Sequence, residues 1–391
     1  MTKWTTELSV MRGVGPVLAC GLFLLASAPV ASADDQAPPA PAPAAPAPED
    51  STPEEARLQV HGYLSQAFAD TDEGLLFGIP NMGTFDYRTV ALQFRFAMTD
   101  HDNLVLQLSS KRLGQSPVMQ VEPDVRLDWG FYERRFAGSG SFKAGRIPIP
   151  QGIYNELRDV GTVLPFYRVP FNFYQEGSYT SETLDGAQVS YTLFDSRTWP
   201  LDVHVYFGGW ELTESLGGST PIAVARAEQG LGGQLWLRTP LPGVRVGLGG
   251  QTYNLRGGSR LPGQKDDWNS WYVSFDGEYQ RVKLQAEYRA VNIGEETDFK
   301  AFYVLAAVNV RKGLSVNALG DFGNLEFPGL DRDLHRDWAV GVSYAFRPNL
   351  VAKVERHWAN TFIEDDRVGG FLDPHPAGKI NYTIVSLAAS F

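Results

Sequence analysis

The chain is poor in cysteine, and beyond its first 34 residues it has no long apolar run. Its single cysteine is Cys20, so no intrachain disulfide and no site with several thiolate ligands can form. No later stretch approaches the roughly 18 apolar residues that a membrane-spanning helix needs. The formal net charge of −11 argues against nucleic acid as a partner, because phosphate backbones bind cationic surfaces.

The sequence also lacks the patterns that mark a catalytic centre. Its six histidines are dispersed. No Ser/His/acid set, cluster of metal ligands or phosphate-binding loop occurs at a suggestive spacing. We therefore predict no enzymatic activity, no catalytic residues, no cofactor and no metal. Lipid hydrolysis by the purified protein would contradict this prediction.

The first 56 residues are predicted to lie outside the folded domain. Lys3 and Arg12 flank the start of an apolar run, and Ala31-Ser32-Ala33 has the small-x-small form of a signal-peptidase site. Residues 1–33 are therefore interpreted as an export signal. Residues 34–56 are rich in proline and alanine and cannot build a core, which predicts a disordered periplasmic leader. Residues 57–391 remain for the folded domain.

Alternation of apolar and polar residues is the main signal in residues 57–391. In residues 282–290, VKLQAEYRA, apolar side chains alternate with Lys, Gln, Glu and Arg. Successive residues of a strand point to opposite faces, so one face suits an apolar medium and the other suits water. About sixteen such segments occur, near 57–69, 87–99, 103–112, 122–137, 140–147, 184–194, 199–211, 229–239, 243–255, 268–281, 282–293, 298–311, 313–323, 336–347, 349–359 and 380–391.

The connections between these segments alternate between tight turns and longer loops. Asp100–Asp102 and Leu241–Gly243 are tight, whereas 70–86, 148–183 and 324–335 are long, an asymmetry typical of outer-membrane barrels. The predicted fold is therefore all-β, a transmembrane antiparallel β-barrel of about 16 strands, with about 14 or 18 as alternatives. A soluble β-sandwich would also alternate. Aromatic residues near strand ends favour the membrane barrel: Trp129, Trp271, Tyr288, Trp338, Phe346 and Trp358.

The last segment, NYTIVSLAASF, strengthens this prediction. It ends on Phe391, with Ala389, Leu387 and Val385 on the same face. It resembles the terminal strand of outer-membrane β-barrel proteins, which implies that the barrel assembly machinery reads Phe391. The whole architecture resembles the bacterial porin superfamily. That resemblance implies an outer-membrane location among membrane lipid and a possible homotrimer.

The 33-residue stretch from Gly145 to Gly177 has no regular period, and a long irregular segment inside a compact domain is usually functional. Residues 148–183 follow the fifth predicted strand, where sixteen-stranded general porins place an inward-folded loop that narrows the pore. Parts of this region, Phe142–Arg146 and Pro150–Glu156 among them, are similar to a run in proteobacterial porin-like proteins. Aromatic residues could anchor the loop on the inner wall. Charged residues predicted at the pore constriction are Arg146, Glu156, Arg158, Asp159, Arg168 and Glu176. A loop folded over the mouth is the alternative.

Residues of the polar strand faces are predicted to line a water-filled lumen. They carry both signs of charge, with no run of lysines and arginines that would favour anions. The sequence thus predicts a porin-like channel for passive diffusion of small hydrophilic solutes or ions, with cations or neutral solutes weakly favoured. A substrate-specific transporter and a plugged structural barrel remain alternatives. The lumen residues are Arg95, Arg126, Asp128, Arg245, Asp276, Glu278, Lys283, Glu287, Arg289, Asp321, Lys353 and Glu355.

Overall fold

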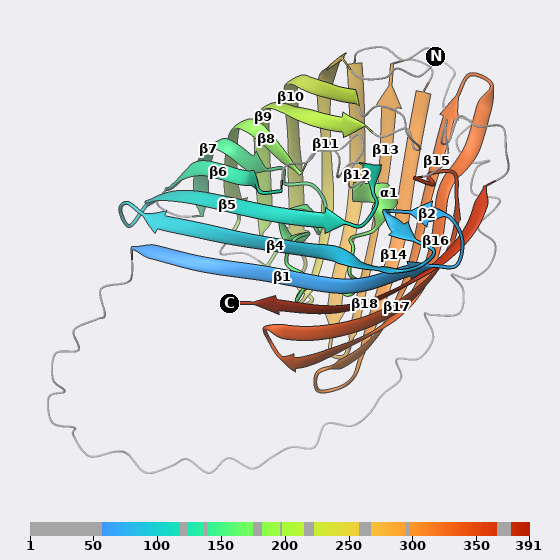
Figure 1. Ribbon diagram of the computed structural model, residues 1–391. Coiled ribbons are helices and arrows are strands. Elements are labelled where there is room, and N and C mark those ends of the chain that lie inside the picture. Colours follow the sequence, from blue (N-terminus) through green and yellow to red (C-terminus); the bar gives the residue numbers. More distant parts are fainter. Residues whose placement is uncertain are drawn as a thin grey trace, which may run out of the picture. The chain divides into compact units, whose positions relative to one another are not determined.

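The computed structural model describes residues 57–117, 124–136, 139–174, 182–195, 198–214, 223–257, 267–294, 297–365 and 377–391. Strands β1 and β4–β18 form a closed antiparallel barrel in which each strand pairs with its neighbours in sequence and β1 pairs with β18 (Figure 1). The predicted sixteen-stranded barrel is confirmed. Its strands are β1 (Leu58–Thr71), β4 (Thr84–Ala97), β5 (Asp102–Leu113), β6 (Arg126–Arg135), β7 (Gly140–Pro148), β8 (Thr183–Leu193), β9 (Leu201–Glu214), β10 (Ala223–Arg238), β11 (Val244–Gly257), β12 (Asp267–Tyr279), β13 (Val282–Ile293), β14 (Thr297–Arg311), β15 (Leu314–Phe327), β16 (Leu330–Arg347), β17 (Leu350–Thr361) and β18 (Gly378–Ser390).

Two connections differ from the prediction. Residues 324–335 were expected to form a loop, but β15 and β16 extend through them to the turn at Gly329, which has a φ of 85°. The connection 70–86 holds an unpredicted two-stranded hairpin, β2 (Leu75–Leu76) and β3 (Ile79–Pro80). Short polar alternation over 324–335 was too weak to distinguish strand from loop.

Side chains alternate between an outer and an inner face of the barrel wall. On β13, Val282 and Leu284 are 50% and 43% exposed, whereas Glu287 and Arg289 are 1% and 2% exposed. The outer face therefore presents apolar side chains, as in a barrel surrounded by lipid. Trp271, Trp338, Phe346 and Trp358 are exposed on it.

Trp129 does not join that outer set. A register shift between Gln107 and Leu108 places Trp129 opposite the buried Gln107. Trp129 packs there against a cluster of buried residues whose members include Phe131 and Ile147. The alternation predicted its side incorrectly because a bulge reverses the facing of one residue, and a single sequence does not reveal a bulge.

The connection after β7 enters the barrel. Its residues 149–174 include the 3₁₀-helix η3 (Asn155–Leu157) and the single helical turn α1 (Phe171–Tyr174). Figure 1 shows α1 among the barrel strands, and its residues contact β13, β14 and β15. Among the described residues, no helix is long and apolar enough to cross a membrane.

Candidate pore-lining site

We call residues 149–174 the inner segment. Its firmest attachment is to Glu287 on β13, a carboxylate with four donors. The Ile153 amide donates to it at 3.1 Å, the Tyr303 hydroxyl donates at 2.6 Å, and the hydroxyls of Ser274 and Tyr174 also donate. A buried carboxylate with this many partners is fully satisfied. Glu287 therefore fixes the start and the end of the inner segment to one point of the wall.

The approach at this point is close enough to require glycine. Gly152 has a φ of 62°, a conformation that other residues rarely adopt, and a Cβ atom there would lie 2.6 Å from the Glu287 carboxylate. Side chains of β12 and β10 donate two hydrogen bonds to backbone carbonyls of the inner segment. The Tyr272 hydroxyl donates to Pro150 at 3.2 Å, and the Gln234 amide donates to Gly152 at 3.2 Å.

Charged residues of β13 to β17 bind the backbone of the second half of the segment. Lys353 donates to the Phe166 carbonyl at 2.9 Å, and Arg289 donates to the Phe173 carbonyl at 3.0 Å. The carboxylates of Glu355 and Asp321 accept from the amides of Tyr167 and Asn172, at 2.9 Å and 3.1 Å. All four of these wall side chains are at most 3% exposed. Each therefore holds the segment rather than facing open water.

Apolar packing supports the same placement. Tyr154, Phe166, Phe173 and Tyr174 are buried in one cluster with wall residues such as Tyr303, Leu305 and Leu319. The prediction that aromatic side chains anchor this region to the inner wall is confirmed for these four residues. Aromatic rings bury large areas, so they secure a segment that has little regular backbone hydrogen bonding of its own.

The opposite side of the segment contacts β5. Asp159 pairs with Lys111 at 2.9 Å and accepts from Gln107 at 3.2 Å. Glu182, just before β8, pairs with Lys111 at 2.8 Å and with Arg158 at 3.1 Å. Arg126 joins Glu182 to Asp128, at 3.3 Å and 2.7 Å. The inner segment is therefore held on two facing walls.

The carboxyl groups of Asp159 and Glu182 in this network differ in pKa. Burial raises the pKa of Asp159, and nearby Lys111 only partly offsets that effect. Burial acts in the same direction on Glu182, but Lys111, Arg158 and Arg126 together hold its pKa below the usual range. Glu182 thus stays ionised to lower pH than Asp159 does.

The hairpin β2–β3 covers the inner segment at the end of the barrel where the longer connections lie. The Phe77 ring lies 4.7 Å from that of Phe171 and 5.4 Å from that of His335 on β16. The Arg168 guanidinium lies 4.2 Å from the Phe77 ring, and it donates to the Tyr87 hydroxyl at 3.2 Å. Nothing in the alternation of residues 70–86 indicated this second inward-folded piece.

The predicted constriction residues do not lie together at one point of the barrel. Arg158 and Asp159 lie in the network with Lys111, and Arg168 lies under the hairpin. Glu156 is about half exposed and lies 3.9 Å from Lys143 of β7. Glu176 lies outside the described residues.

Arg146 is placed differently from its prediction. It pairs with Asp185 at 2.8 Å and donates to the Leu127 carbonyl. Its neighbour Ile147 is fully buried inside the barrel, so alternation puts Arg146 on the outer face. Its position is a correction to the sequence analysis, which counted Arg146 within the predicted strand 140–147 and yet grouped it with the charges of the irregular stretch that follows.

The predicted lumen residues divide between two walls. Arg289, Lys353, Glu355, Glu287 and Asp321 bind the inner segment as described. Arg95 instead pairs with Glu133 at 3.1 Å. Arg126 and Asp128 belong to the network with Glu182. Asp276 pairs with Arg245 at 2.9 Å. Glu278 and Lys283 lie near the short-turn end of β12 and β13, and Glu278 is exposed there.

The comparisons with known proteins agree with this geometry. No protein-family model and no curated protein sequence matches the chain. Many solved structures share its fold, among them the following three. OmpF of Salmonella typhi, in a complex with daunomycin, has a TM-score of 0.59 and 14% identity, over 85% of this chain and 97% of that one. The outer-membrane channel DcaP of Acinetobacter baumannii gives 0.56 and 11%, over 85% and 97%. OprB of Pseudomonas putida gives 0.52 and 11%, over 85% and 94%. The chain therefore has the fold of sixteen-stranded outer-membrane porins.

Proposed function

We propose that the chain is a bacterial outer-membrane channel through which small hydrophilic solutes or ions diffuse passively, with residues 149–174 narrowing the pore. The observation that carries this proposal is the closed sixteen-stranded barrel with that segment held across its interior. Barrels of this size are too wide for side chains alone to fill. Irregular backbone is stable at membrane depth only where protein or water surrounds it.

The water-accessible side of the interior supports a path beside β4 to β9. Glu156 and Leu157 are the exposed residues of η3, about 45% and 43%. Across from them, Lys143 and Glu133 are partly exposed and Arg95 is 30% exposed. Both signs of charge face this gap, which suits neutral or zwitterionic solutes and gives weak ion selectivity.

A plugged barrel is the second candidate, and the attachments on both walls favour it. Fixed by Asp159 on one side and Glu287 on the other, the inner segment would need to lose contacts before a larger solute passed. A substrate-specific transporter would show the same geometry with a ligand-dependent current. DcaP, one of the structural neighbours named above, is an outer-membrane channel, which favours a channel over an enzyme.

The test is single-channel recording in planar bilayers of residues 34–391, beside a variant lacking residues 154–172. We expect a small stable conductance that rises on deletion. Silence from the intact protein with current from the deletion would favour the plugged barrel. Silence from both, with folded barrels, would remove the channel proposal.

We further propose a homotrimer, supported by polar groups at two separate places on the outer face. Arg146 and Asp185 pair on β7 and β8, and on β17 and β18 Arg356 donates to the Thr383 hydroxyl at 2.8 Å. A charge on the lipid face costs about 2–4 kcal/mol near the bilayer centre, so a second copy covering these groups would relieve that cost. The trimeric form named among the structural neighbours is that of OmpT of Vibrio cholerae. Cross-linking in membranes should give trimers.

Recognition of Phe391 by the barrel assembly machinery is likewise proposed, and removal of Phe391 should slow assembly.

A further inference from the structure

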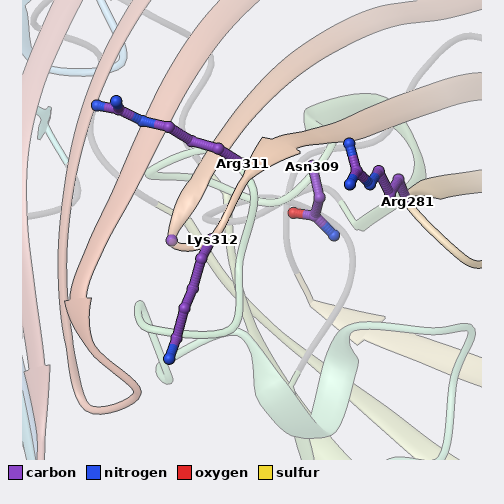
Figure 2. Close-up of a pocket in the computed structure, with 5 residues that line it drawn as sticks. Arg281, Asn309, Arg311 and Lys312 are labelled. Carbon is purple, nitrogen blue, oxygen red and sulfur yellow. The ribbon is translucent and has the colours of Figure 1, made fainter.

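Three cations gather at two neighbouring turns of the barrel. Arg281 lies in the turn between β12 and β13, and Arg311 and Lys312 lie at the turn between β14 and β15. They line a cavity of about 340 Å³ together with Asn309 and Gly313, as Figure 2 shows. All three cationic side chains are exposed. We call Arg281, Arg311 and Lys312 the basic rim.

The backbone holds the two turns together. The Asn309 amide donates to the Arg281 carbonyl at 2.7 Å, which joins one turn to the other. Gly313 has a φ of 79°, and a Cβ there would lie 2.6 Å from the Ala345 carbonyl oxygen. The second turn is thus fixed against β16 as well. The spacing of the three cations is set by the barrel.

None of the three has an acidic partner within 4.0 Å among the residues that the structure describes. Most other cations of the described barrel are paired, as Arg95 is with Glu133 and Arg245 with Asp276. Figure 2 shows the three cationic side chains pointing in different directions around the cavity. The basic rim therefore offers several donors to a ligand from outside the chain.

The surroundings of the rim indicate where that ligand comes from. Val282 and Val310, next to Arg281 and Arg311, are 50% and 51% exposed on the outer face. Tyr279, at the end of β12, is 62% exposed. Arg311 pairs across the turn with Leu314, an outer-face position. Cations beside an apolar band and an interfacial tyrosine lie at the height of lipid headgroups.

We propose that the basic rim binds the phosphate group of an anionic phospholipid in the leaflet at the short-turn end of the barrel, which in outer-membrane barrels is the periplasmic end. Guanidinium groups bind phosphate oxygens through paired N–H donors, and lysine adds a point charge. The acyl chains of the lipid lie against Val282 and Val310. This site does not depend on whether the barrel conducts.

The test compares lipid retention in native mass spectrometry of the detergent-purified barrel after equilibration with vesicles of phosphatidylglycerol or phosphatidylcholine. The test variant carries R281Q, R311Q and K312Q. The control carries R226Q, R256Q and K379Q, three exposed cations toward the long-connection end of the barrel. We expect wild type and control to retain phosphatidylglycerol, and the test variant to retain roughly tenfold less or lower. Phosphatidylcholine should be retained weakly by all three.

Two results would overturn the proposal. Equal retention of phosphatidylglycerol by the test variant and the control would show that the rim does not hold the headgroup. Displacement of the lipid by millimolar inorganic phosphate, with no preference for phosphatidylglycerol, would make the rim a site for free anions. Resistance of each variant to SDS at room temperature verifies that its barrel is folded.

Discussion

The two sides of the barrel interior differ in what their charged residues do. On β13 to β17, side chains such as Glu287, Lys353 and Glu355 are buried and bind the backbone of residues 149–174. On β4 to β9, Arg95, Glu133 and Lys143 stay partly exposed and pair mostly with one another. The same alternating pattern in the sequence thus gives an anchoring wall on one side and a wetted wall on the other. The difference arises because the inner segment packs along β13 to β17 over much of its length, whereas on the β4 to β9 side its charged contacts centre on Asp159 and Lys111 near β5.

Removing the main anchor should have the largest effect. Glu287→Ala leaves two tyrosine hydroxyls and a serine hydroxyl without this acceptor, and it removes one of the two acceptors of the Ile153 amide. We expect a loss of about 3 kcal/mol or more in the free energy of unfolding and a several-fold rise in single-channel conductance. Glu278→Ala is the control, because that carboxylate is exposed near a strand end. Equal behaviour of the two variants in thermal unfolding and bilayer recording would contradict the anchoring role.

A smaller change at the same contact should loosen it without removing a charge. Gly152→Ala places a Cβ 2.6 Å from the Glu287 carboxylate and also strains a φ of 62°. Gly329→Ala strains a φ of 85° with nothing within 4 Å. Each substitution should lower the free energy of unfolding by about 1 kcal/mol through its backbone strain. Only Gly152→Ala should also raise conductance, and matching currents from the two variants would refute the close approach.

The attachment to β5 should respond to pH. The ionised form of Asp159 pairs with Lys111, so this tether exists above the pKa of Asp159 and is lost as the pH falls through it. Because burial raises that pKa above the ordinary value of 3.8, release should begin at a pH where exposed aspartates are still charged. Conductance recorded from pH 7 downward should therefore rise on acidification. Asp159→Asn should show the acid-level conductance already at pH 7, and an unchanged pH profile in this variant would assign the transition elsewhere.

The smallest effects concern two basic residues of β7. Lys143 faces Glu156 inside the barrel, whereas Arg146 pairs with Asp185 on the outer face. Lys143→Gln should shift the reversal potential in a salt gradient modestly toward cations. Arg146→Gln should leave conductance and selectivity unchanged. A selectivity change from Arg146→Gln would return that residue to the constriction, where the sequence had placed it.

The alternation of residues 57–391 was enough to predict the barrel, and the resemblance to general porins indicated the strand after which the chain turns inward. The period of two is a local property of a strand, so the sequence of each strand alone indicates which of its residues share a face. The contacts of Glu287 with Ile153 and Tyr174 could not be predicted, because these two residues lie more than a hundred positions away in sequence. The bulge beside Trp129 and the inward hairpin at Phe77 were missed for a related reason: a bulge changes one residue's facing, and a short hairpin has too few residues to show a period.

The most direct measurement tests whether residues 149–174 lie inside the barrel. A Cβ at Gly161 would be 3.3 Å from the Cβ of Ser65 on the inner face of β1, slightly below the range of about 3.5–4.5 Å that disulfides favour. In the form beginning at residue 34, which lacks Cys20, the pair S65C/G161C should form a disulfide, seen as a reduction-sensitive band shift after a single proteolytic cut between the two cysteines. L64C/G161C, with its first cysteine on the outer face, should not. Absence of the bond in folded S65C/G161C, or equal cross-linking of both pairs, would contradict the placement of the inner segment across the lumen.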